Sequence, residues 1–286
     1  MSFQKRRFAQ VDVFTAMPLL GNALAVVIDG DGLSEAAMAR FARWTNLSET
    51  TFLLKPTDPA ADYRVRIFTP GGELPFAGHP TLGSAHCWLA SGGVPKTKGE
   101  VVQQCEIGLV KLRRSASGAG KERLAFAAPP LRRSGPVDGD LRVQALRALR
   151  LDAEDVLDLE WVDNGPSWMA ARLKNAEAVL ALKPDFGAMK GLKLGVVGAY
   201  PAGSPQQFEV RAFVPELGVP EDPVTGSLNA GIALWMQGAG LAPHRYVAAQ
   251  GAALGRAGRV HVTREADGTT WIGGDVVALI EGQVTL

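Results

Sequence analysis

Two short stretches of the chain carry side chains that could transfer a proton, and the second stretch nearly repeats the first. Residues 65–84 read VRIFTPGGELPFAGHPTLGS, and residues 210–227 read VRAFVPELGVPEDPVTGS. Val, Arg, Phe and Pro recur in register at the start of each stretch, and Pro, Gly and Ser recur at the end. Between these identities, His79 of the first copy is aligned with Asp222 of the second. A base and an acid therefore stand at one position of a duplicated motif.

Each motif leads into a segment that is mostly apolar or small around its circumference, at residues 80–91 and 223–237. This pattern predicts two buried helices. The His-Pro and Asp-Pro pairs predict the helix starts, because proline is tolerated at the first helical position and its predecessor is pushed out of the α region. Aspartate is a favoured N-cap and histidine is not, so capping would explain Asp222 but not His79.

A third candidate, Glu49, directly precedes the apolar segment TTFLL. A carboxylate beside buried strand has its charged form disfavoured by desolvation, and a nearby Asp222 would raise the pKa of Glu49 further. A glutamate whose pKa moves from about 4.3 towards neutrality can take up a proton and return it. Glu49, His79 and Asp222 would then form a proton-transfer set that needs no metal and no cofactor.

The substrate of such a set is expected to be a small anion, since the free N–H groups at a helix start favour negative charge. Gly78 and Gly226 would let a ligand approach the backbone there. Ser227 in the second motif and Asn22 in GNALAVV are further candidates for binding the substrate. If two halves of the chain face each other, both helix starts converge on one cleft.

The elements that would position these residues are mostly short β-rich segments broken by turns, with few helical patterns. Helices are predicted over 34–44, where Ser34 suits the N-cap, and over 140–151. The motifs lie 145 residues apart, about half the chain, which indicates two similar halves. The predicted fold is α+β, with two pseudo-symmetric domains, each a β-barrel-like sheet around a central helix. We expect domains at 1–128, completed by a strand over 278–286, and at 129–277, because the Pro- and Gly-rich stretch 127–140 separates the motifs.

Composition excludes several classes of function. The 286 residues are 47% hydrophobic and carry a net charge of +1, with no basic stripe, so we expect neither nucleic-acid nor membrane-surface binding. The two cysteines form no disulfide framework or metal cluster. The first residues have a basic patch but no apolar run of signal-peptide length behind it, and no segment approaches the roughly 18 apolar residues of a membrane span. A cytoplasmic location is expected.

In combination, TNLSETTF, the paired VR-x-F-x-P, ELPFAGHPT, EDPVTGS and QGAALGRAGRV resemble the PhzF-like phenazine-biosynthesis isomerases, which have the diaminopimelate-epimerase fold. The resemblance implies a homodimer and a site between the two halves. It also implies cofactor-free isomerisation in which Glu49 moves a proton between two carbons of a small carboxylated substrate, while His79, Asp222 and Ser227 orient the substrate and relay protons. The motifs around both predicted helix starts lack cysteine, which excludes a racemase with two catalytic thiols.

Three other functions remain open from the residues alone. Ser227, His79 and Asp222 have the types of a hydrolase triad, but the serine lies in VTGSLN and not in a G-x-S-x-G elbow. A non-catalytic small-molecule binding protein on the same scaffold would need no tuned base. Glu49, His79 and Asp222 could also bind a metal ion, although no close-spaced pair such as H-x-x-x-H supports this.

Overall fold

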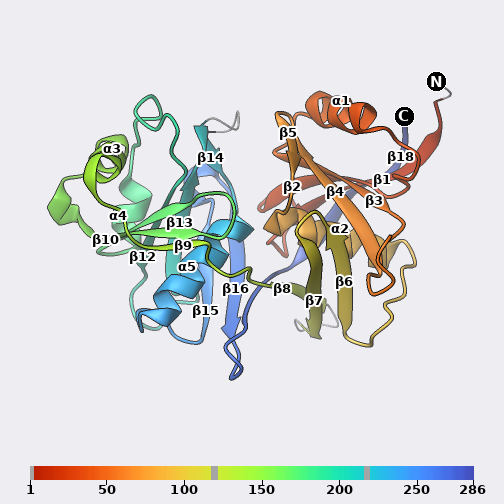
Figure 1. Cartoon of the computed structure of the whole chain (residues 1–286). Coiled ribbons are helices and arrows are strands. Elements are labelled where there is room, and N and C mark those ends of the chain that lie inside the picture. The colour runs from red at the N-terminus through yellow and green to blue at the C-terminus, as the bar shows by residue number, and fades with distance from the viewer. Residues whose placement is uncertain (1–2, 117–121, 216–219) are drawn as a thin grey trace. The chain divides into compact units, whose positions relative to one another are not determined.

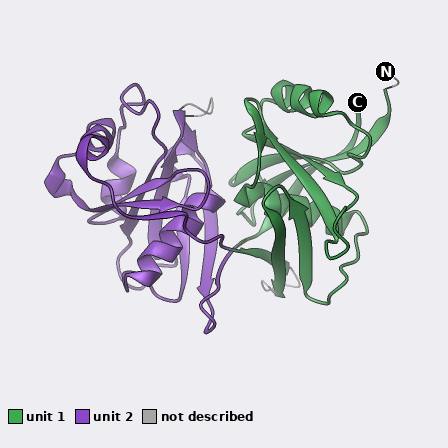
Figure 2. Cartoon of the chain, in the orientation of Figure 1, with its two compact units in different colours: residues 1–127, 273–286 green, residues 128–272 purple. Residues whose placement is uncertain are grey.

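The computed structural model describes residues 3–116, 122–215 and 220–286, and Figure 1 shows the course of the chain. The chain divides into two compact units. Unit 1 comprises residues 1–127 and 273–286, and unit 2 comprises residues 128–272, as coloured in Figure 2.

Unit 1 is a curled sheet that encloses one helix. Its strands follow the order β18–β1–β2–β3–β4, then β5 and β6, which pair one after the other along the far edge of β4, then β7 and β8. The strands are β1 (Lys5–Val13), β2 (Asn22–Val27), β3 (Glu49–Leu54), β4 (Tyr63–Thr69), β5 (Gly72–Leu74), β6 (Glu100–Cys105), β7 (Gly108–Ala116), β8 (Glu122–Ala127) and β18 (Val276–Thr285). The helices are α1 (Glu35–Thr45) and α2 (Gly78–Ala90).

The two helices of unit 1 lie on opposite faces of this sheet. In α1, the Ser34 hydroxyl caps the start by accepting from the Ala37 N–H, as the sequence predicts. The helix is amphipathic and packs Phe41 edge-on against Phe52 of the sheet. In contrast, α2 is buried around most of its circumference and contacts β1, β2, β3, β4, β6, β8 and β18. An all-round apolar helix therefore sits inside the curl of the sheet.

Unit 2 repeats this arrangement. Its strands are β9 (Arg133–Pro136), β10 (Val156–Asp163), β11 (Met169–Leu173), β12 (Leu194–Ala199), β13 (Phe208–Phe213), β14 (Glu221–Asp222), β15 (Arg245–Gln250) and β16 (Gly258–Arg264), while β17 (Thr270–Gly274) spans the boundary between the units in the sequence. The α-helices are α3 (Gly139–Leu149), α4 (Ala176–Ala181) and α5 (Gly226–Gly238), with short 3₁₀ turns at Ala153–Asp155 and Ala252–Leu254. Here α5 is the buried central helix and α4 packs on the outer face of the sheet.

The two units share one strand topology. The succession β1, β2, β3, β4 is antiparallel, parallel and antiparallel, and β10 to β13 pair in the same way. In unit 1, β4 pairs with the short antiparallel strand β5 and with the parallel strand β6. In unit 2, β13 pairs in the same way with β14 and β15. The predicted α+β fold, with two pseudo-symmetric β-barrel-like sheets around central helices, is confirmed.

The register of the repeat differs from the sequence alignment. Phe68 pairs with Glu73 in unit 1, and its counterpart Phe213 pairs with Glu221 in unit 2. The central helices then begin at Gly78 and Gly226, so that the second helical residues are His79 and Ser227. The hydrogen bonds between paired strands set this register. The P-x-x-G-S identities, which aligned His79 with Asp222, do not follow it.

The predicted start of α5 is therefore wrong. Asp222 lies in β14, Thr225 is the N-cap position, and the helix begins three residues after Pro223. In α2, the N-cap position is Ala77, and Pro80 is the third helical residue. Neither cap position carries a side-chain cap hydrogen bond.

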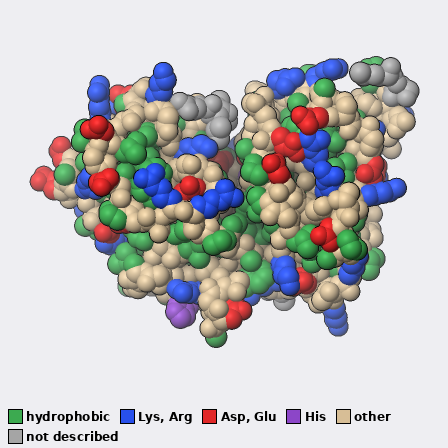
Figure 3. Space-filling model, in the orientation of Figure 1, with side chains coloured by type: hydrophobic (Ala, Val, Ile, Leu, Met, Phe, Trp, Pro, Cys, Tyr) green, Lys and Arg blue, Asp and Glu red, His purple; other side chains and the backbone are tan. Residues whose placement is uncertain are grey.

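The surface carries acidic and basic side chains interspersed over the face of both units seen in Figure 3, in keeping with the net charge of +1. Among the described residues, no helix combines the length and apolar character that crossing a membrane would require.

Candidate active site

His79 and Glu49 meet inside unit 1. His79, the second residue of α2, is 3% exposed, and its Nε2 lies 3.3 Å from Oε2 of Glu49. Glu49 is the first residue of β3, and 14% of its side chain is exposed. The first residue of β3 thus places a mostly buried carboxylate beside the start of the central helix α2.

Asn22 determines which nitrogen of His79 carries the proton. The Asn22 Nδ2 amide lies 3.3 Å from His79 Nδ1, and the Ser48 hydroxyl donates to Asn22 Oδ1 at 3.4 Å. Because an amide NH₂ can only donate, Nδ1 must be the acceptor. Burial lowers the pKa of His79 to about 3, so the ring is neutral near pH 7 and holds its proton on Nε2, facing Glu49.

The start of β2, where Asn22 lies, is held in place through Gly21 and Asp12. Gly21 donates its N–H to Oδ2 of the buried Asp12 at 3.0 Å. A Cβ at Gly21 would lie 2.2 Å from the Val13 carbonyl oxygen, so only glycine fits. Sequence reasoning missed Asp12, Gly21 and Ser48, although the glycine before Asn22 was a local signal.

Asp222 belongs to a hydrogen-bond network in unit 2 centred on Gln250. Oδ2 of Asp222 accepts from the Thr225 hydroxyl at 2.6 Å. Gln250, 1% exposed, donates to the Asp222 carbonyl and to Thr225 Oγ1, and it accepts from the Thr225 N–H and from Asn229. This network ties the end of β14 to the first turn of α5. Gln250 was in the QGAALG motif, but its role was not predicted.

Ser227 is held in unit 2 by two residues that sequence reasoning also missed. Trp168 Nε1 donates to Ser227 Oγ at 3.0 Å, and Asn164 Nδ2 donates to the Ser227 carbonyl at 2.8 Å. Because the indole N–H is only a donor, the serine hydroxyl keeps its own proton for another acceptor. Ser227 is 9% exposed.

Each unit thus gathers its own set of candidate residues at the start of its central helix. Unit 1 brings together Glu49, His79 and Asn22, with Gly78 as the first residue of α2. Unit 2 places Asp222 and Ser227 about the start of α5, which begins at Gly226. Gly78 and Gly226 are both buried.

The two cysteines lie away from these helix starts. Cys87 is in the last turn of α2, where burial raises the pKa of its thiol to about 12, and Cys105 ends β6. Within residues 3–116, 122–215 and 220–286, no three His, Cys, Asp or Glu side chains group closely enough to hold a metal ion.

Comparison with known sequences identifies relatives over almost the whole chain. Residues 11–282 match the model of the phenazine biosynthesis-like protein family, PhzC–PhzF. The chain is 33% identical over 289 residues to antisense-enhancing sequence 1 of Schizosaccharomyces pombe, covering 96% of this chain and 97% of that protein. It is also 33% identical over 295 residues to trans-2,3-dihydro-3-hydroxyanthranilate isomerase of Pseudomonas aeruginosa, covering 98% and 99%.

Solved structures agree with this assignment at the level of the fold. A PhzF-family phenazine biosynthesis protein of Bacillus anthracis superposes with a TM-score of 0.84 at 22% identity, covering 99% of this chain and all of that one. The fold is the diaminopimelate epimerase-like fold of these proteins. The chain therefore belongs to the phenazine biosynthesis-like PhzC–PhzF family, and it is an isomerase.

Proposed function

We propose that this isomerase moves a proton between two carbons of a small carboxylated substrate, without a cofactor, and that Glu49 is the acid and base. In the proposed reaction, the Glu49 carboxylate removes a proton from one carbon next to an unsaturated or carbonyl group. The same carboxyl then returns a proton to another carbon of the delocalised system. One carboxyl group can serve both carbons, because returning the proton restores the carboxylate.

The observation that carries this proposal is the contact between Glu49 and the neutral, buried His79. With Asn22 on Nδ1, the ring offers Nε2–H to the carboxylate, 3.3 Å away. In the proposed reaction, this contact would tighten into a hydrogen bond that orients Glu49 and is released as the carboxyl becomes protonated. A mostly buried carboxylate of this kind is suited to exchanging protons with carbon.

The substrate would bind in a cleft between unit 1, residues 1–127 and 273–286, and unit 2, residues 128–272. The peptide N–H groups near Gly78 and Gly226 would hold its carboxylate, since helix starts favour anions. From unit 2, the Ser227 hydroxyl would donate to the substrate. Asp222, braced by Thr225, would accept from a substrate hydroxyl or amino group.

The geometry gives less support to the alternatives. In a hydrolase triad, an acidic side chain orients the histidine while the second ring nitrogen faces the serine. His79 instead contacts Asn22 through Nδ1 and Glu49 through Nε2. A binding protein without activity would have no need for a neutral histidine aimed at a shielded carboxylate.

The proposal predicts that Glu49→Gln blocks carbon–proton exchange. The first compound to test is trans-2,3-dihydro-3-hydroxyanthranilate, named in the Pseudomonas aeruginosa relative. In D₂O, proton NMR should show the wild type incorporating deuterium and forming product, and Glu49→Gln should slow both by about 10²–10⁴-fold. The exposed Glu177→Gln is the control and should match the wild type.

Wild-type exchange rates in Glu49→Gln would contradict the assignment of the base. A wild type that leaves this compound unchanged would reject the compound alone, and the same test would then be run with other unsaturated ring carboxylates. We further propose that the enzyme is a homodimer and that it acts in the cytoplasm. Sedimentation equilibrium would test the dimer, whose mass should be twice the 30.3 kDa of the chain.

A further inference from the structure

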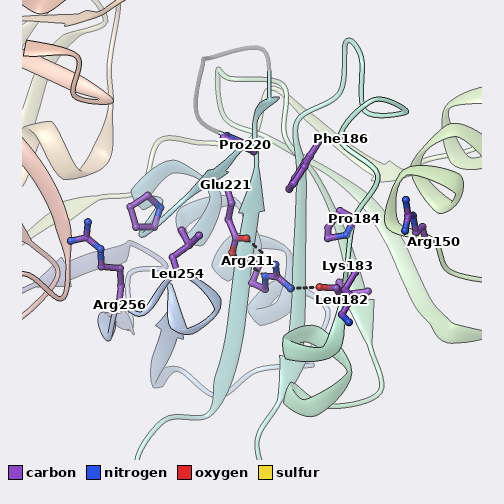
Figure 4. A pocket seen from close by; sticks show the side chains of 11 residues that line it. Arg150, Leu182, Lys183, Pro184, Phe186, Arg211, Pro220, Glu221, Leu254 and Arg256 are labelled. Atoms are coloured by element: carbon purple, nitrogen blue, oxygen red, sulfur yellow. Dashed lines mark hydrogen bonds and ion pairs between the residues drawn. The ribbon is translucent and has the colours of Figure 1, made fainter.

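Unit 2 contains a cavity that the proposed reaction does not use. Its volume is about 680 Å³, within the range of small-molecule pockets, and every residue that lines it belongs to unit 2. The floor is the buried ion pair between Arg211 and Glu221, and Figure 4 shows Phe186 and Leu254 on either side of this pair.

The lining combines apolar and cationic side chains. Phe186 and Leu254 are 37% and 44% exposed, and prolines extend the apolar surface. Arg150 and Lys183 add exposed positive charges at the rim. Lys183 makes no ion pair within the described part of the chain, and Arg150 reaches a carboxylate only at 3.8 Å, on Asp185. Cationic groups beside exposed apolar surface suit an anion with an apolar body.

The equivalent place in unit 1 shows that this charge is not imposed by the fold. A hollow of about 580 Å³ lies beside the counterpart pair, Arg66 and Glu73. There, Arg66 also binds Glu35, and Glu106 adds another carboxylate to the lining. With Arg64 also present, the described lining of the hollow in unit 1 has three carboxylates and two guanidinium groups, whereas that of the pocket in unit 2, with Arg256 included, has one carboxylate and four cationic side chains.

Arg211 itself is not available to a ligand in the way that the rim cations are. Its guanidinium donates twice to Glu221, and Nη1 donates to the carbonyls of Val179 and Leu182. These partners satisfy the buried Arg211 without any second carboxylate like Glu35 of unit 1. The anion would therefore be held by Arg150 and Lys183, over a floor that is already neutral.

The pocket lies on the opposite face of β14 from the candidate active site. Side chains alternate along a strand, and Glu221 and Asp222 are consecutive. Glu221 turns to Arg211 and the pocket, while the Asp222 carboxylate turns to Thr225 at the start of α5.

We propose that this pocket is a second binding site, for an organic anion with an aromatic or branched aliphatic body. Lys183 and Arg150 bind the carboxylate, sulfonate or phosphate group, and Phe186 and Leu254 cover the apolar part. The site is independent of Glu49.

The test uses 8-anilinonaphthalene-1-sulfonate, an aromatic anion whose fluorescence rises when it leaves water. Wild-type protein is expected to bind one equivalent, with inorganic phosphate competing. The double variant Arg150→Glu/Lys183→Glu should weaken binding by about tenfold or more. The control Lys174→Glu/Lys190→Glu changes the same charge at exposed positions of unit 2 outside the pocket, and it should bind as the wild type does.

Two further variants locate the probe. Phe186→Ala should weaken binding of the probe but leave the affinity for inorganic phosphate unchanged, because the phosphate has no apolar body. Glu49→Gln should bind the probe as the wild type does. Equal binding by the pocket and control double variants, or loss of binding in Glu49→Gln, would overturn the proposal. Far-ultraviolet circular dichroism of every variant would check that each is folded.

Discussion

At the scale of single residues, burial favours the neutral form of two groups with opposite charge. It lowers the pKa of His79 to about 3, and it raises the pKa of Glu209 to about 6. His79 belongs to the candidate site in unit 1. Glu209 is fully buried in β13 of unit 2, where it accepts from the Tyr200 hydroxyl at 2.7 Å. The two groups therefore give stability opposite dependences on pH.

His79 is expected to stay neutral down to at least pH 5. An unfolded chain protonates this histidine below about pH 6.5 and the native protein does not, so its contribution to stability falls as the pH falls from about 6.5 towards 3. Long-range proton–nitrogen correlation spectra should show one protonated nitrogen, Nε2, from pH 8 to pH 5. A His79 ring that gains a second proton between pH 7 and pH 6 would refute this assignment.

Glu209→Gln is expected to stabilise the protein at alkaline pH. The carboxyl has a raised pKa, so its contribution to stability is full below about pH 4.5 and is lost as the pH rises towards 6. Glutamine keeps an acceptor for Tyr200 and removes the buried charge. Urea unfolding should show a gain of about 1–2 kcal/mol at pH 8 and a smaller difference at pH 5. A variant less stable than the wild type at pH 8 would contradict this explanation.

At the scale of elements, the central helices depend on glycines in their second turns. A Cβ at Gly83 of α2 would lie 2.5 Å from Leu24 Cδ2, at the end of a side chain. A Cβ at Gly231 of α5 would lie 2.4 Å from the carbonyl oxygen of Val162, in the backbone of β10. Both glycines therefore allow a central helix to pack closely against its own sheet.

The two alanine variants should therefore differ. Alanine alone favours a helix over glycine by about 1 kcal/mol. At Gly83 this gain offsets a small shift of Leu24, and we expect a change below about 1 kcal/mol. At Gly231 the strand backbone cannot move as easily, and we expect a loss of about 2–3 kcal/mol in urea unfolding. Equal effects of the two substitutions would show that the Val162 backbone does not limit the helix position.

At the scale of the whole molecule, one topology carries two different sets of side chains. Glu49 directly precedes Thr50, which pairs with Phe68, whereas in unit 2 the residue before Leu194, which pairs with Phe213, is Lys193. His79 and Ser227 are both second residues of central helices. The repeat conserves an Arg–Glu pair beside each helix start but places the proposed base in unit 1 only.

That repeated ion pair gives a matched test within one chain. The side chains of Arg211 and Glu221 are each 6% exposed, whereas those of Arg66 and Glu73 are 19% and 27% exposed. Glu221→Gln should cost about 3 kcal/mol, because it leaves a buried charge uncompensated. Glu73→Gln should cost under about 1 kcal/mol, since Arg66 keeps Glu35 and some contact with water. Urea unfolding would measure both, and a greater loss in Glu73→Gln would reject the importance of burial.

Much of the organisation could be predicted because its causes are local. The all-round apolar segments, the Ser34 cap and the half-chain repeat indicated the central helices, α1 and the two-part fold. Motifs also marked Glu49, His79, Asp222 and Ser227 as candidates. Residue type and neighbouring sequence carry this information directly.

The contacts of those candidates were decided only by the tertiary structure. Asn22 meets His79 across 57 residues, and Trp168 meets Ser227 across 59. No local pattern encodes such pairs. The same holds for the equivalence of His79 with Ser227, which depends on the ladder between β13 and β14. Strand pairing fixes register through hydrogen bonds between segments distant in sequence, and a side chain's chemistry then depends on what that register brings to it.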